Sequence, residues 1–136
     1  MWDLDDSAKF VRVLALQVPW AHTWADMRPG KTDLERRERL RTAASEHIAS
    51  IPAHVSWWAF RISVRKAGRR PFDVENVPKP VIDAFCGRQI RRDKSTFGQL
   101  ALYPDDSVDH VRFIQLIGER SQTGDSTTIE VFAFVG

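Results

Sequence analysis

Cysteine is almost absent from this sequence, because Cys86 is the only one among 136 residues. A single cysteine excludes an internal disulfide framework and favours a reducing, cytoplasmic setting. No stretch approaches the roughly 20 apolar residues that a membrane helix needs. Three of the first six residues are aspartates and none is basic, whereas a secretory signal begins with a basic segment followed by a long apolar one. We therefore expect neither a membrane span nor a signal peptide.

Repeats and low-complexity linkers are also missing from the sequence. The length is enough to bury one ordinary core, and 43% hydrophobic with 28% charged residues is a globular composition. We therefore predict a single domain over residues 1–136.

Charge is unevenly distributed along the chain. Between Arg61 and Lys94 ten basic residues stand against four acidic ones, a net charge of +6, while the whole chain carries only +2. The remainder is therefore acidic, at −4. A basic zone of this kind suits a phosphate backbone, but charge alone favours a solvated face with a flexible loop.

Hydrophobic periodicity predicts four strands and two helices. The prediction rests on alternating apolar residues in the strands and on Leu40, Ala44, Ile48 and Ile51 at helical spacing, with Asp33 as an N-cap. The four arginines 36, 37, 39 and 41 are expected on a solvated helix face. In chain order the elements are a strand Phe10–Val18, a helix Asp33–Ser50, a strand Val55–Lys66, a helix ending near Phe85 or Gly87, a strand Ser107–Ile117 and a strand Thr127–Val135.

The order β-α-β-α-β-β indicates an α/β or α+β domain, with a mixed sheet and helices packed on it. We expect the last two strands to form a hairpin across residues 118–126. Residues 87–102 are predicted to be a polar, basic loop. The loop after the first strand contains the turn Arg28-Pro29-Gly30, and its Trp20 and Trp24 are candidates to contact DNA or a partner.

The most informative stretch is Pro71 to Phe85, which reads PFDVENVPKPVIDAF. Asp73 and Glu75 are two residues apart, so in an extended segment both carboxylates could reach one cation. Lys79 and Asp83 follow at helical spacing and could form a polar stripe with Glu75. Pro80 leaves a second possibility, in which the regular helix begins only at Pro80 and residues 73–79 form a shaped turn.

A second pair of acids, Asp105 and Asp106, follows Tyr103-Pro104 and precedes a predicted strand. Such a junction is a common place for a metal ligand. Alone, Asp-x-Glu and Asp-Asp are weak signals, because such pairs more often cap helices or fill turns.

Together, Asp-Val-Glu-Asn-(x2)-Lys-(x3)-Asp-Ala-Phe and the later Asp-Asp before a strand resemble the RusA-like Holliday junction resolvases. These are small magnesium-dependent endonucleases that cut branched DNA. The family pattern is Asp-x-Asp-Asn-(x2)-Lys-(x3)-Asp, followed by Asp-Asp at the start of a strand. The close match covers residues 73–85 and 103–112.

The resemblance implies a metal-dependent, structure-selective endodeoxyribonuclease that acts as a homodimer on four-way DNA junctions. It implies Mg²⁺, with Mn²⁺ as a possible substitute, held by Asp73, Glu75 and Asp106. Lys79 would assist the phosphate chemistry as a catalytic residue. Asn76, Asp83 and Asp105 would have supporting roles. The residues that we expect to contact DNA are Arg65, Lys66, Arg69, Arg70, Arg91, Arg92 and Lys94.

The sequence departs from the family pattern at two places. Glu75 stands where the family usually has Asp, and the link from Cys86 to Leu102 is longer than expected. This link could be an extra DNA-contacting loop, a dimer element or an insertion that changes the substrate.

Two other interpretations remain open. The chain could be a non-catalytic DNA-binding member of the same fold, which needs only the basic surface. It could also be a small interaction module, which needs an exposed apolar patch. The nuclease interpretation requires Asp73, Glu75 and Asp106 to converge.

Overall fold

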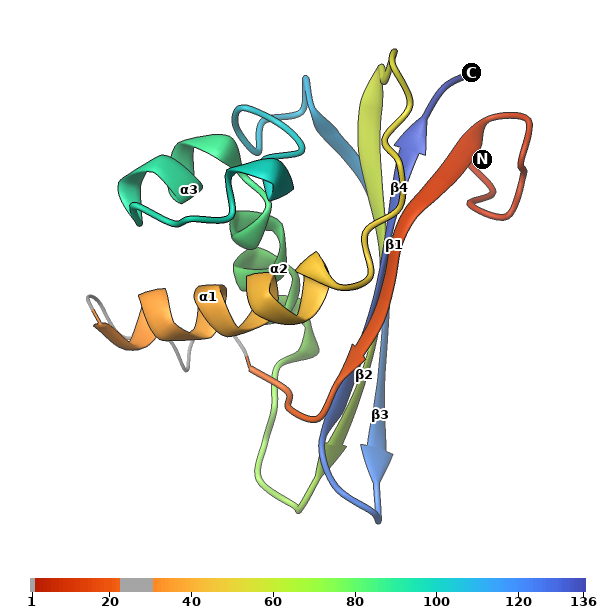
Figure 1. Ribbon diagram of the computed structural model, residues 1–136. Coiled ribbons are helices and arrows are strands. Elements are labelled where there is room, and N and C mark those ends of the chain that lie inside the picture. Colours follow the sequence, from red (N-terminus) through yellow and green to blue (C-terminus); the bar gives the residue numbers. More distant parts are fainter. Residues whose placement is uncertain (1, 23–30) are drawn as a thin grey trace.

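The computed structural model describes residues 2–22 and 31–136 (Figure 1). Trp24 and the predicted turn at Arg28–Gly30 lie outside this range. The elements in chain order are β1 (Phe10–Val18), α1 (Lys31–Ser45), β2 (Trp57–Ala67), the 3-10 turn η2 (Val74–Asn76), α2 (Pro78–Ala84), α3 (Gly87–Arg92), the 3-10 turn η3 (Gly98–Leu100), β3 (Val111–Ser121) and β4 (Ser126–Phe134).

The strands form one mixed sheet in the order β1-β4-β2-β3. β4 runs antiparallel to both β1 and β2, whereas β3 runs parallel to β2. The predicted hairpin between the last two strands is therefore wrong. Residues 122–125 pass over the end of β2, and Asp125 Oδ1 accepts a hydrogen bond from the backbone N–H of Ala67 at 2.8 Å.

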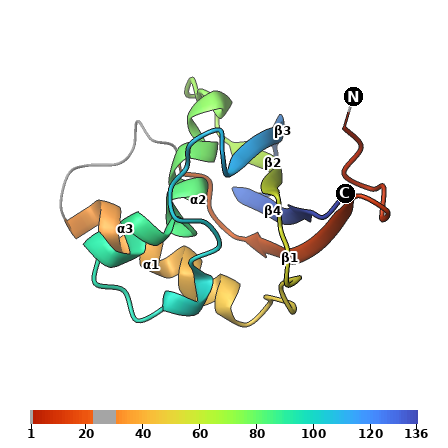
Figure 2. The ribbon, with the colours of Figure 1, turned by 90° about the horizontal axis from the view of Figure 1, so that it is seen from above.

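The three helices cover one face of this sheet, as Figures 1 and 2 show from two directions. β2 alternates between the faces: Trp58, Phe60 and Ile62 are buried under the helices. Trp57 and Ala59 point to the other face, where they pack with Leu4. This alternation follows from the period of two in a strand. The chain is thus a single α+β domain, as predicted from the sequence.

Two predicted segments are corrected by the structure. The first helix spans Lys31–Ser45, so Asp33 lies in its first turn rather than at its N-cap, and Ile51 is 43% exposed beyond its end. Residues 87–102 are not a loop, because they contain α3 and η3, whose Ile90 and Leu100 are buried in the core. The first strand, Phe10–Val18, is confirmed.

Trp20 does not form an open stacking platform. The ring is half-buried and packs against the core, and the guanidinium carbon of Arg39 lies 4.3 Å from its centroid. Within the described residues, no helix is long and apolar enough to cross a membrane.

Candidate active site at the start of the second helix

The 3-10 turn η2 leads directly into α2, so neither predicted form of this segment is fully correct. The helix begins at Pro78, and Pro80 lies within its first turn, where its missing N–H has no intrahelical partner to lose. Asp73 precedes the turn in an extended conformation, and the backbone N–H of Asn76 donates to Asp73 O at 3.1 Å. The side chains of Asp73 and Glu75 are on exposed residues.

Val74 anchors this turn against the sheet. A Cβ atom on Gly118 of β3 would lie only 2.8 Å from Val74 Cγ2, so the glycine permits the close approach. Gly118 belongs to the second half of β3, whereas Asp106 precedes the first half of the same strand. The two predicted motifs therefore lie at different positions along the length of β3.

Backbone hydrogen bonds hold the second motif beside α2 and α3. Gly87 N donates to Tyr103 O at 2.7 Å, and Arg88 N donates to Pro104 O at 3.0 Å. The hydroxyl of Tyr103 donates to Ile82 O at 2.6 Å from within the core. A Cβ atom on Gly87 would lie 3.3 Å from Tyr103 O, so the glycine lets the two segments approach closely. These contacts fix the position of the acidic pair that follows.

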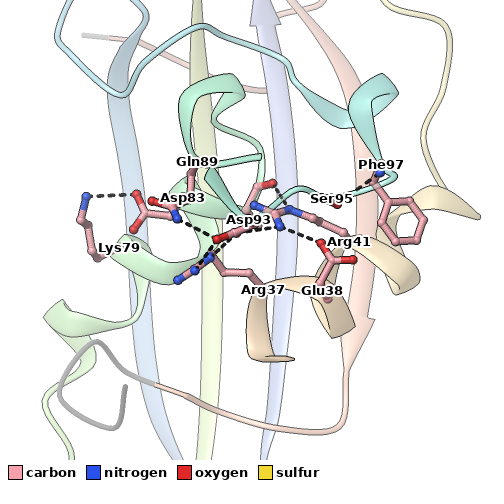
Figure 3. Close-up of polar contacts among 10 residues, drawn as sticks. Arg37, Glu38, Arg41, Lys79, Asp83, Gln89, Asp93, Ser95 and Phe97 are labelled. Carbon is pink, nitrogen blue, oxygen red and sulfur yellow. Dashed lines mark hydrogen bonds and ion pairs between the residues drawn. The ribbon is translucent and has the colours of Figure 1, made fainter. Parts of the chain in front are cut away.

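Lys79 joins the two motifs. Its Nζ donates to Asp83 Oδ1 and to Asp106 Oδ2, each at 3.0 Å, and so lies between two carboxylates (Figure 3 shows the Asp83 contact). Arg88 at the start of α3 adds a cation, with Nη2 at 3.7 Å from Asp106 Oδ1. The predicted catalytic lysine and one predicted acid therefore meet, together with Asp83. Sequence reasoning counted Arg88 only as part of the basic zone.

The protonation states follow from these contacts. Burial alone would lower the pKa of Lys79, but its hydrogen bonds to Asp106 and Asp83 outweigh burial and raise the pKa. The hydrogen bond from Lys79 lowers the pKa of Asp106. Burial raises the pKa of Asp83 despite its bond to Lys79. At neutral pH, Lys79 is thus a cation and cannot act as a neutral base, and Asp106 is an anion and cannot donate a proton.

The predicted metal ligands do not assemble into one site. No three histidine, cysteine, aspartate or glutamate side chains of residues 2–22 and 31–136 form a group that could hold a metal ion. Asp73, Glu75 and Asp106 all belong to this range, so the expected convergence is not met. Asp83 and Asp106 are oxygen donors of the kind that magnesium prefers. The ammonium group of Lys79 lies between them, so the arrangement as it stands does not fit a bound cation.

A second polar cluster links the three helices and was not expected from the sequence. Arg41 is 0% exposed; its Nε donates to Ala84 O at 2.7 Å, and its Nη1 donates to Asp93 at 2.9 Å. Arg37 donates twice to Asp93, both at 2.7 Å (Figure 3). The prediction that these two arginines lie on a solvated face is therefore wrong. The spacing of residues did contain a signal for this burial, because Arg37 and Arg41 lie on the same side of the helix as Leu40 and Ala44.

The cations predicted to contact DNA fall into two groups. Arg69 and Arg70 are exposed on the turn after β2, and Arg120 donates to Gly68 O and Arg70 O beside them. Arg65 is exposed near this turn, while Lys66 is held by Asp125 at 3.0 Å. The other group is exposed on α3 and after its end, close to Arg88, and consists of Arg91, Arg92 and Lys94.

Similarity to known families and to curated proteins adds nothing to the geometry of this site. No family model matches the chain. No curated protein matches it either.

Proposed function

We propose that the protein is a structure-selective endodeoxyribonuclease that cuts branched DNA and works as a homodimer. One observation carries the proposal: Lys79 Nζ lies 3.0 Å from Asp106 Oδ2, although the two residues are 27 positions apart. They belong to the two separate motifs on which the resemblance to RusA-like resolvases rests.

The residues of the chain suit a phosphodiester substrate. The Lys79 ammonium group remains charged at neutral pH and is 47% exposed, so it can also reach a phosphate oxygen. Arg88 is 53% exposed beside it and adds a second cation. Such groups stabilise the negative charge that builds on phosphate oxygens during strand cleavage.

The requirement for Mg²⁺, or for Mn²⁺ in its place, rests on the resemblance alone. A bound divalent cation lowers the pKa of a water and stabilises charge on the phosphate. Because the described carboxylates do not form a site for it, we assign it no step.

Cleavage of a labelled four-way junction tests the proposal directly. Wild type is compared with Asp106→Asn on the junction and on a linear duplex of matching sequence, each with Mg²⁺, Mn²⁺ or EDTA. Asp109→Asn is the matched control, because Asp109 is exposed in the same loop. We expect metal-dependent cutting of the junction by wild type and Asp109→Asn, and a loss of at least about a hundredfold in Asp106→Asn, because Asp106 holds the ammonium group of Lys79 that is to stabilise the phosphate charge. Equal cutting by all three proteins would reject the proposed site.

A DNA-binding protein without catalysis is the second candidate. The separation of Asp73 and Glu75 from Asp106 favours it, because binding needs only the basic surface. Junction binding without cutting in either metal would support this candidate against the nuclease.

A further inference from the structure

β3 is an open edge of the sheet. It is 11 residues long, and among the described strands it pairs with β2 alone. Beyond the pairing with β2, no backbone hydrogen bond from the described residues reaches residues 112–121. An edge of this kind presents free N–H and C=O groups that can pair with another strand.

The opposite edge of the sheet is protected in two ways. β1 has a bulge between Arg12 and Leu14, and Ala49 N donates to Val13 O at 2.8 Å. β3 also has a register shift, but it lies at the start of the strand, between Val111 and Phe113, and the charged residues of β3 lie toward its two ends. Its central residues, 113–118, have no charge and no proline, and they pair with β2 in regular register from Phe113 onward. Since natural edges usually carry a charge, a proline or a bulge, this unprotected central stretch is suited to a partner.

Apolar side chains accompany the open edge. Ile114 is 40% exposed on the face covered by the helices, and Ile117 is 45% exposed on the other face. A strand added in the plane of the sheet would cover both, because it extends both faces at once.

We propose that the partner is a second copy of this chain, with β3 pairing antiparallel to its counterpart about a two-fold axis at Gln115. The inference rests on the proposed function only for the expectation of a homodimer, and it names the surface. In this register Phe113 lies opposite the partner's Ile117, and Ile114 lies opposite the partner's Leu116. Such apolar cross-strand pairs are stabilising.

The two neighbouring registers are less favourable for pairing of the two β3 strands. A two-fold axis perpendicular to the sheet keeps each side chain on its own face, so the axis must pass through a residue position. An axis at Leu116 would place Arg112 opposite Arg120, and like charges directly opposite are destabilising. An axis at Ile114 would leave residues 118–121 without strand partners.

Charge also favours an antiparallel copy. The loop before β3 carries Asp105, Asp106 and Asp109, whereas Arg69, Arg70 and Arg120 lie at the far end of the strand. Antiparallel pairing brings the acidic end of one copy beside the basic end of the other, twice per dimer. This is charge complementarity of the kind found between partner surfaces.

Cysteine cross-linking tests the register. Residue 115 faces itself across the axis, so Gln115→Cys is expected to give a disulfide-linked dimer under mild oxidation. Arg112→Cys, which would face Gly118, is the matched control and should remain uncross-linked. Wild type has only the buried Cys86 and should not cross-link. Equal cross-linking of the two variants, or none in Gln115→Cys, would overturn the register.

Light scattering tests the surface. We expect wild type to have twice the 15.6 kDa mass of one chain, and Ile114→Lys to have the mass of a monomer with an unchanged far-ultraviolet circular dichroism spectrum. Val108→Lys is the control, since Val108 is 72% exposed outside the strand, and it should remain dimeric. If Ile114→Lys does not fold, Ile117→Lys replaces it as the variant that disrupts the interface.

The outcomes separate this inference from the nuclease. A wild-type monomer, or a dimer that persists in both isoleucine variants, would refute the β3 interface whether or not DNA is cut. A dimer lost in these variants, with no cleavage of junctions, would retain the interface and reject the nuclease.

Discussion

Asp93 lies between two buried arginines, and this cluster fixes the positions of all three helices. Burial opposes its ionisation, but hydrogen bonds from Arg37, Gln89 and Arg41 outweigh burial and lower its pKa below the ordinary value. A buried charge is tolerated only where such partners surround it.

We predict that Asp93→Asn lowers the free energy of unfolding at pH 7 by about 3 kcal/mol, because it leaves two buried arginines short of an anion. The folded-state pKa of Asp93 is depressed, so its stabilising contribution is present above the unfolded value and is lost as pH falls through the folded value. The difference from wild type should therefore shrink below about pH 4.

Urea denaturation at several pH values measures this difference. The exposed Asp109→Asn is the control and should change stability by less than about 0.5 kcal/mol. A small effect of Asp93→Asn at pH 7 would mean that the arginines find other partners.

The burial of Arg41 could not be inferred from its residue type, because arginine is mostly exposed in folded proteins. The partners that permit it, Ala84 O and Asp93, come 43 and 52 residues later in the chain. Sequence reasoning had placed Asp93 in a basic loop, so neither partner pointed to the other. Lys79 and Asp83 were different, since their spacing of four within one helix predicted the contact that is observed.

At the scale of elements, Gly118 controls how closely η2 approaches β3. We predict that Gly118→Ala lowers the free energy of unfolding by about 1–3 kcal/mol, because the added methyl group would lie 2.8 Å from Val74 Cγ2.

A double-mutant cycle with Val74→Ala checks the cause. The smaller side chain makes room for the methyl group, so the double variant should be more stable than the sum of the single effects predicts. Additive effects would show that the glycine matters for the backbone of β3 rather than for this contact.

The topology was only partly predictable from the pattern. Alternation located the four strands within a few residues, because one face of each is buried. It could not decide which strands pair, and a short link normally indicates a hairpin. Here residues 122–125 are held by Asp125 across the end of β2, a contact between distant residues that no local signal encodes.

For the whole molecule, we predict that α3 lies on the DNA-binding surface. Arg91 and Arg92 are exposed in its last turn, and Arg88 at its start lies beside Asp106. Replacing both Arg91 and Arg92 with alanine should weaken binding to a similar extent for all DNA sequences. The logarithm of the binding constant falls as the logarithm of salt concentration rises. The steepness of this dependence should decrease by about 1.8, as expected for two lost phosphate contacts.

Fluorescence anisotropy over a range of salt concentrations measures this slope. Lys9→Ala is the control, since Lys9 is exposed on the opposite side of the sheet near Trp2. An unchanged slope in the double variant would remove α3 from the DNA surface and leave the turn at Arg69 and Arg70 as the candidate.

The candidate site was predictable to the extent that its residues are local. The helix at Lys79 and the acids at residues 105 and 106 were found as patterns, and the fold brings Lys79 and Asp106 together. The relative height of η2 on the sheet depends on the contact between Val74 and Gly118, so the separation of Asp73 and Glu75 from Asp106 could not be foreseen.

The position of β4 has a consequence for synthesis on the ribosome. β4 is translated after the other three strands, yet it lies between β1 and β2 and is the only strand neighbour that β1 has in the described sheet. Until residue 134 has left the exit tunnel, β1 and the aromatic side chains near it have no sheet to join. Folding is therefore deferred to the end of this segment, and a nascent chain stalled before β4 exposes β1 without a strand partner and β2 with one open edge to chaperones and proteases.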